Sequence, residues 1–187
     1  MKAARVMDLK PPPGVRAAPY PIWRDVAYRV ALALGALAMA VILVGGATGR
    51  PDGVLWVLAV ATAGAAWMFF VWMPMWRYLV LGLTAIGVVL MVWAAWPWAV
   101  GFYLAALSVM AAKEDHCFHF IGGKYFPWAA LVAVGFAVFD LPPAARIAAW
   151  AVATALFWLL ALERWRLPWL RLSSEASQGA APTPPTP

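Results

Sequence analysis

Long apolar stretches, interrupted by short polar breaks, run along most of this 187-residue chain. A helix needs roughly 20 apolar residues to cross a hydrocarbon core of about 30 Å, and these stretches approach or reach that length. The alternation of apolar and polar residues that marks a membrane β-barrel is absent, so we expect helices that satisfy their own backbone hydrogen bonds. The predicted spans are residues 26–47, 54–73, 78–95, 98–112, 126–139 and 144–162.

The breaks between the predicted spans carry the residues of turns. Residues 48–53 read TGRPDG and residues 140–143 read DLPP, with the Gly, Pro and Asp that favour turns. Residues 74–77 are so few that the second and third spans are expected to return antiparallel, side by side. The fourth and fifth spans are short, so each is expected to extend into the polar residues 113–125 or to lie tilted in thinned lipid.

Composition places the chain in the same class. Hydrophobic residues make up 65% of it, charged residues 12%, and the mean hydropathy is +0.79, far from the roughly 25% charged share of soluble domains. We therefore predict an all-α polytopic membrane protein, a bundle of six transmembrane helices. The expected divisions are a basic N-terminal segment, the membrane domain, an interfacial basic and aromatic segment at helical spacing, and a Pro-rich tail with a disordered composition, at residues 1–25, 26–162, 163–172 and 173–187.

The basic residues predict the orientation of the bundle. With both termini in the cytoplasm, 12 of the 14 Lys and Arg residues fall on the inner side and only Arg50 and Arg146 on the outer side, as the positive-inside rule requires. In this arrangement the basic residues of the N-terminal segment, Arg29 included, stay in water. The net charge of +6 is then explained by the anionic inner leaflet, so the expected partner is the lipid bilayer and not nucleic acid.

Small residues spaced four apart predict close helix contacts, because they allow backbones to approach where lipid is as apolar as the side chains. Such pairs are Ala31 with Gly35, Ala59 with Ala63 or Ala61 with Ala65, and Ala144 with Ala148.

The polar stretch KEDHCFH at residues 113–119 holds every His and Cys of the chain. If a helix continues past residue 112, Asp115, His116 and His119 share one face, and two imidazoles with a carboxylate could hold a transition metal. Cys117 could join only if the helix breaks, and no fourth ligand is evident. The alternative is a hydrogen-bonded helix end in which Lys113 pairs with Glu114 or a neighbouring carboxylate. We favour the alternative, so neither a metal nor haem is expected.

Three classes of function fit the pattern. The spans lack catalytic motifs, which favours a non-enzymatic subunit or assembly factor of a membrane complex, partnered by other membrane subunits or by further copies of the chain. A metal- or haem-linked redox or trafficking protein would use the 113–119 stretch. A small-molecule or ion transporter is disfavoured, because the polar non-aromatic residues inside the spans are only Thr62, Thr84, Ser108 and Thr154.

The chain resembles the DUF2301 family of uncharacterised prokaryotic integral membrane proteins. The resemblance rests on KEDHCF at residues 113–118 after an apolar span, on an aromatic residue and Pro127 opening the next span, and on a basic end with Pro168. The family pattern matches Lys113, Glu114, Cys117 and Phe118, whereas His116 and His119 lie outside it. The resemblance implies a six-helix protein of the bacterial inner membrane without an assigned activity, and it directs interest to those four residues.

Overall fold

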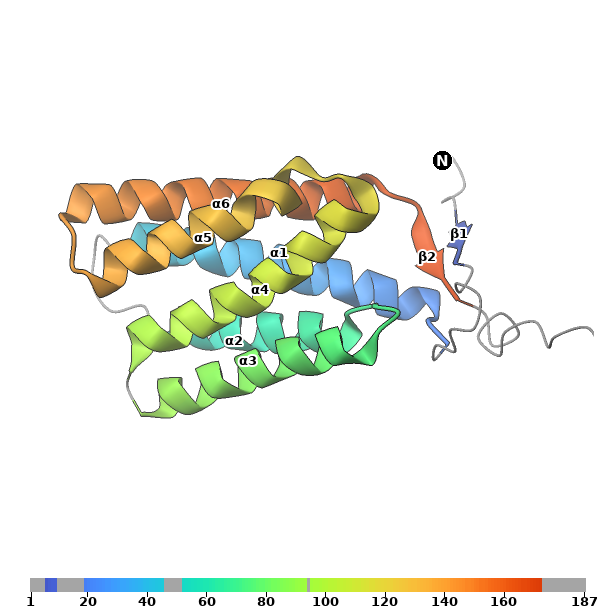
Figure 1. Cartoon of the computed structure of the whole chain (residues 1–187), viewed down its shortest axis with the longest axis horizontal. Helices are drawn as coiled ribbons and strands as arrows, with labels where there is room; N and C mark the ends of the chain where they lie inside the picture. The colour runs from blue at the N-terminus through green and yellow to red at the C-terminus, as the bar shows by residue number, and fades with distance from the viewer. Residues whose placement is uncertain (1–5, 10–18, 46–51, 94, 173–187) are drawn as a thin grey trace, which may run out of the picture.

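The computed structural model describes residues 6–9, 19–45, 52–93 and 95–172. The described residues form six helices and a pair of short strands, and the helices lie side by side along one axis with the strands at one end (Figure 1). The prediction of an all-helical bundle is confirmed. The elements in chain order are β1 (Val6–Asp8), α1 (Ile22–Gly45), α2 (Asp52–Met68), α3 (Pro74–Val92), α4 (Trp96–Phe118), α5 (Ile121–Val138), α6 (Pro143–Arg166) and β2 (Trp169–Arg171).

Four of the described helices, α1, α3, α5 and α6, are long and apolar enough to cross a membrane. Helix α2 is apolar but shorter, with 17 residues, and α4 has 23 residues of which the last turns carry charge. Of the two alternatives expected for the short fourth and fifth stretches, the helices show the extension into residues 113–125, since α4 runs to Phe118 and α5 begins at Ile121. Pro127 therefore lies inside α5 instead of opening it.

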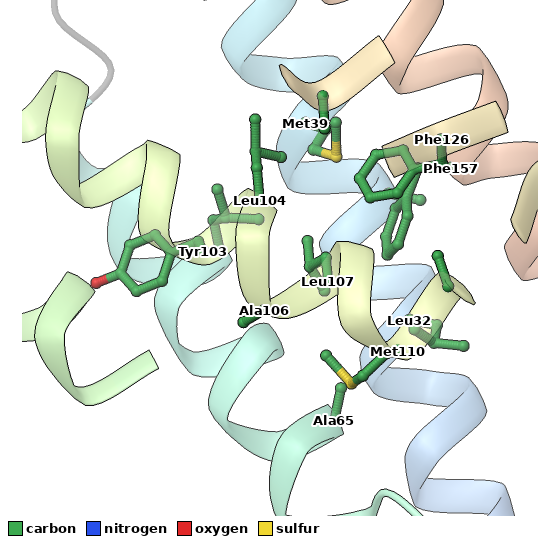
Figure 2. Packing of buried hydrophobic residues seen from close by; sticks show 14 of the residues in the cluster. Leu32, Met39, Ala65, Tyr103, Leu104, Ala106, Leu107, Met110, Phe126 and Phe157 are labelled. Carbon is green, nitrogen blue, oxygen red and sulfur yellow. The ribbon is translucent and has the colours of Figure 1, made fainter. Parts of the chain in front are cut away.

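Helix α4 forms the centre of the core. It packs against α2, α3 and α5. Core side chains such as Met39 of α1, Ala65 of α2 and Phe157 of α6 gather around it in Figure 2. On one side Phe126 of α5 lies against Phe157 of α6, with ring centroids 4.8 Å apart. On the other side Tyr103 points towards α3, where its hydroxyl lies 3.8 Å from the Met91 sulfur. Because α4 is surrounded by other helices on several sides, fewer of its side chains face lipid, and it can carry charged residues in its last turns.

Two adjacent glycines let α5 pass between its neighbours at the start of the helix. A Cβ atom at Gly122 would meet the backbone of α6, 2.7 Å from the Leu156 carbonyl oxygen. A Cβ atom at Gly123 would meet the backbone of α4, 2.7 Å from the Ala111 carbonyl oxygen. Backbone atoms cannot move aside as a flexible side chain can, so the close packing of α4, α5 and α6 depends on glycine at both positions.

The predicted small-residue contacts are confirmed for two of the three pairs. Ala31 is buried in α1 against Gly64 of α2, and a Cβ at Gly35 would lie 3.9 Å from Ala61 and 3.3 Å from the Phe157 ring. Ala65 is also fully buried. Ala144 and Ala148 are exposed on α6, so the third predicted contact is wrong within this chain.

Near its two ends the described chain forms a two-stranded ribbon, which consists of β1, β2 and the bridge between Tyr20 and Leu172. Strands β1 and β2 pair in parallel, with Val6 opposite Trp169 and Asp8 opposite Arg171, and Tyr20 exchanges two backbone hydrogen bonds with Leu172. The helical spacing expected for Trp165, Trp169 and Leu172 does not continue in the structure, because α6 ends at Arg166 and β2 follows. The main chain after Leu167 finds its partners in the N-terminal segment, which satisfies backbone groups that a helix would have paired internally. The predicted tail, residues 173–187, lies outside the described residues.

Candidate functional site: a buried ionic cluster

Five charged side chains from three helices meet where the bundle joins the ribbon. We call Asp25, Arg29, Lys113, Glu114 and Arg164 the ionic cluster. Four of these side chains are no more than 1% exposed, and Lys113 is 17% exposed. Charges buried to this degree are retained only when they are paired and hydrogen-bonded.

Asp25 is the centre of one half of the ionic cluster. Its carboxylate accepts hydrogen bonds from Arg29 Nε at 3.0 Å, one turn along α1, and from the Arg164 guanidinium of α6. The backbone N–H of Leu170 in β2 donates to the same carboxylate at 3.2 Å. One aspartate thus connects α1, α6 and the ribbon.

Arg29 uses its remaining donors on the end of α6. Its guanidinium donates to the carbonyl oxygens of Leu167 at 2.9 Å and Pro168 at 2.6 Å, and it lies 4.3 Å from the centre of the Trp169 ring. Carbonyls at the end of a helix have no partner in that helix and carry its partial negative charge. Arg29 therefore caps α6 and holds the turn that leads into β2.

Glu114 is the centre of the other half. Its Oε1 accepts a hydrogen bond from Lys113 Nζ at 3.0 Å, and its Oε2 lies 3.7 Å from Arg164 Nη1, an ion-pair distance that is too long for a hydrogen bond. Among the described residues, Glu114 Oε2, the Tyr28 hydroxyl and Arg164 Nε and Nη1 are buried without a hydrogen-bond partner. This half is held by charge more than by directed hydrogen bonds.

Glu163, next to Arg164 in α6, caps a neighbouring helix. Its carboxylate oxygens accept the backbone N–H groups of Ile121 and Gly122, each at 3.1 Å. The first N–H groups of a helix have no partner of their own, and a negative charge there is favourable. The pair Glu163 and Arg164 therefore fixes the end of α6 against both α5 and α1.

The residues highlighted by the family resemblance lie on two sides of α4. The predicted pairing of Lys113 with Glu114 is confirmed, and Glu114 points into the bundle. The Phe118 ring is half-buried and lies 5.3 Å from the Arg164 guanidinium, whereas Cys117 is exposed. Lys113 and Glu114 thus belong to the ionic cluster and Phe118 lies against it, whereas Cys117 does not.

The metal candidates do not assemble with a further ligand in the part of the chain that the structure describes. His116 and His119 are exposed, Asp115 is half-buried, and His119 ends α4 in the left-handed region with φ of 55°. Across residues 6–9, 19–45, 52–93 and 95–172, no three His, Cys, Asp or Glu side chains are placed to hold a metal ion.

Three members of the ionic cluster were not predicted from the sequence: Asp25, Arg29 and Arg164. Arg29 was expected to stay in water, and that expectation is wrong, because α1 begins at Ile22 and buries this side chain. The spacing of Asp25 and Arg29, four apart on one helix, is a pattern that forms ion pairs and was available in the sequence. Arg164 carries no comparable local signal, since both of its acidic partners lie on other helices.

An apolar groove of about 630 Å³ lies beside the ionic cluster. Its walls come from the turn between α2 and α3, the last turns of α4, and the ribbon, and they include Phe70, Trp72, Val109 and Leu170. Lys113 is the member of the ionic cluster that lines this groove. The groove therefore has apolar walls and a cation at one side.

Two side chains of the ribbon, outside the membrane-spanning segments, have pKa values shifted from their ordinary values: Tyr20 and Asp8. The Tyr20 hydroxyl donates to the Met68 carbonyl at 3.1 Å, and burial, followed by the charge of Asp25, raises the pKa of this phenol. The exposed Asp8 carboxylate accepts a hydrogen bond from Arg171 Nε at 2.7 Å, which lowers the pKa of Asp8. At neutral pH the Tyr20 phenol is therefore protonated and Asp8 is ionised, and in these states their hydrogen bonds to Met68 and Arg171 stabilise the ribbon.

Comparison of the chain with protein-family models, with curated proteins and with solved structures finds no match. The resemblance to the DUF2301 family accordingly stays a prediction.

Proposed function

We propose that this chain is a six-span protein of a bacterial inner membrane, with both termini in the cytoplasm, that serves as a non-enzymatic subunit or assembly factor of a membrane complex. In this proposal α2 and α4 cross the membrane with the four longer apolar helices. The ribbon supports an even number of crossings, because it pairs Val6–Asp8 near one end of the chain with Trp169–Arg171 near the other.

The distribution of cations supports the orientation. The end of the bundle that carries the ribbon also carries the start of α1, the turns between α2 and α3 and between α4 and α5, and the end of α6 (Figure 1). Described cations at that end are Arg24, Arg29, Arg77, Lys113, Lys124, Arg164, Arg166 and Arg171, whereas Arg146 lies at the opposite end, paired with Asp140. The positive-inside rule places the cation-rich end in the cytoplasm.

The observation that carries the role as a subunit is the open face of α3. Only 17% of the apolar stretch of α3 is buried, against 39% for α1, although both helices belong to one bundle. Gly82 and Ala85 are exposed on this face, and a Cβ atom at Gly82 would meet nothing within 4 Å. Small residues on an exposed membrane helix allow a second helix to approach closely, so α3 is the proposed contact with a partner subunit.

Two of the threonine hydroxyls inside the predicted spans favour a scaffold over a transporter. The hydroxyls of Thr62 and Thr84 each donate to the carbonyl four residues earlier in their own helix, at 2.8 Å. A hydroxyl committed to its own backbone is a poor relay for an ion or a polar solute. The strongly polar site in the described chain, the ionic cluster, is used to fasten helices together.

The test is purification of the tagged full chain from native membranes in a mild detergent, with measurement of stoichiometry and of metal content. We expect a stoichiometric complex with another membrane protein or with an untagged copy of the chain. Gly82→Leu should reduce this association, whereas Gly135→Leu, which also adds a side chain into open space on α5, should not. A wild-type chain that runs alone, or an association equally sensitive to both substitutions, would contradict the proposal.

A further inference from the structure

We infer that the apolar groove beside the ionic cluster binds one anionic phospholipid, with its phosphate on Lys113 and an acyl chain along the apolar walls. This inference goes beyond the proposed role as a subunit; it rests on the proposed membrane orientation and not on that role.

The side chains of the ionic cluster include one more cation than anions. Arg29, Lys113 and Arg164 contribute three positive charges and Asp25 and Glu114 two negative ones, which leaves one positive charge among side chains that are nearly all buried. Part of this excess is offset at Arg29 by the carbonyl oxygens at the end of α6. An anion close to the remaining cations would be favourable, because an opposite charge nearby lowers the cost of a buried charge.

Lys113 is the member through which an anion can reach the cluster. Its side chain is 17% exposed, whereas those of the other four members are no more than 1% exposed. It also lines the groove, where its Nζ lies 5.7 Å from the centre of the Phe69 ring and 5.5 Å from that of Phe118. Because Glu114 takes one of the three ammonium donors, the others are free for a phosphate.

The groove has the chemistry of a lipid site and not of a site for a soluble anion. Its volume of about 630 Å³ lies within the range of sites that take small molecules, and its walls are mainly aromatic and aliphatic. Met73 and Trp76 also line the groove, and both are exposed. Trp is enriched where membrane helices meet the headgroup region. A cation beside a pocket between membrane helices, at the cytoplasmic end of the proposed orientation, can bind the phosphate of an anionic headgroup.

The occupant is therefore an amphiphile with a negative head that lies at the depth of the headgroups. A bilayer phospholipid meets this description at high local concentration and without leaving the membrane. A free fatty acid shares the anionic head and the acyl chain, so the experiment includes it as a separate arm.

Native mass spectrometry of the purified full chain, with defined lipids added in detergent, tests the inference. The probes are phosphatidylglycerol, zwitterionic phosphatidylcholine with the same acyl chains, and oleate. We expect the wild type to retain one phosphatidylglycerol in preference to the other two. Loss of one cation near an anionic headgroup should lower its occupancy about fivefold in Lys113→Gln, whereas Lys113→Arg should retain it.

Two further variants separate the groove from the charge of this end of the protein. Val109→Trp fills the groove while leaving every charge in place, so it should remove the bound lipid. Lys124→Gln removes a cation at the same end of the bundle, on α5 and away from the groove, so it should leave lipid retention unchanged. Should Lys113→Gln fail to fold because Glu114 loses its partner, Val109→Trp and Lys113→Arg still decide the question.

Equal retention of phosphatidylglycerol and phosphatidylcholine by the wild type would overturn the inference. So would retention of phosphatidylglycerol by Val109→Trp, or preferential retention of oleate. A lipid that is lost from Val109→Trp but kept by a folded Lys113→Gln would show that the groove holds an acyl chain without reading the headgroup, which also overturns it.

Discussion

Arg164 of α6 and Asp25 of α1 form a buried ion pair across 139 residues of sequence. The same aspartate binds Arg29 and the backbone of Leu170, so one carboxylate fastens the first helix, the last helix and the ribbon. Removing one partner of a buried ion pair costs more than the pair itself contributes, because the remaining charge stays buried without compensation.

Asp25→Asn should therefore destabilise the protein strongly. The amide keeps the size of the side chain but leaves the Arg29 and Arg164 guanidinium groups without their shared anion. We expect a loss of about 3–5 kcal/mol in the free energy of unfolding, measured by denaturant titration in micelles, together with a lower yield of inserted protein.

Asp8→Asn provides the matched control for that measurement. Asp8 also pairs with an arginine, Arg171, but its side chain is 60% exposed, and exposed pairs contribute little to stability. We expect no measurable change in the unfolding midpoint. If the Asp8 and Asp25 substitutions lower the midpoint equally, the ionic cluster has no special structural role.

Gly122→Ala should disrupt the start of α5. The added methyl group would meet backbone atoms of Leu156 and Leu160 in α6, and overpacking against atoms that cannot move costs about 1–3 kcal/mol or more. Gly135→Ala in the same helix meets open space and should leave the stability unchanged or slightly raise it, because alanine favours a helix. Thermal unfolding of both variants in one detergent compares them directly, and a tolerated alanine at residue 122 would refute the close crossing of α5 and α6.

The helices were predictable because their apolar length leaves few alternatives. The extension of α4 and α5 also followed from the shortness of the apolar stretches. The ribbon was not predictable from the sequence. Its strands β1 and β2 form their backbone hydrogen bonds with each other although they are more than 150 residues apart, and neither has a strong strand pattern alone. The pair Lys113 and Glu114 was predicted because the two residues are adjacent in sequence. The pair Arg164 and Asp25 was not predicted, because it depends on how α1 and α6 pack in the folded protein.

Tyr20→Phe should change how stability depends on alkaline pH. The pKa of Tyr20 is raised in the folded protein, so its contribution is complete below the unfolded value of about 10 and is lost as the pH rises above it. At pH 7 the variant should be less stable by about 1 kcal/mol, the net contribution of its hydrogen bond to Met68. The difference between wild type and variant should shrink above about pH 10. Denaturant midpoints of wild type and variant at pH 7 and above about pH 10 measure this difference in stability. A difference that stays constant with pH would contradict the assigned burial of the phenol.

Replacing both histidines should leave the fold intact. His116 and His119 are exposed, and the left-handed φ of His119 is one that glycine adopts without strain. We expect the double variant His116→Ala and His119→Gly to keep the thermal stability of the wild type, and zinc, copper and iron to be substoichiometric in both proteins. One equivalent of metal in the wild type, lost with stability in the double variant, would instead support the redox or trafficking function.

The proposed orientation can be tested with the single native cysteine. Cys117 is exposed at the cation-rich end of the bundle, and Phe139, 79% exposed, lies at the opposite end after one crossing by α5. In intact cells a membrane-impermeant maleimide should leave the wild type unlabelled, because the cation-rich end faces the cytoplasm. A Phe139→Cys variant in a Cys117→Ser background should react from outside. Both proteins should react after permeabilisation, which shows that each thiol is accessible. Labelling of Cys117 from outside intact cells would reverse the orientation, and equal labelling of both proteins before permeabilisation would argue that α5 does not cross the membrane at all.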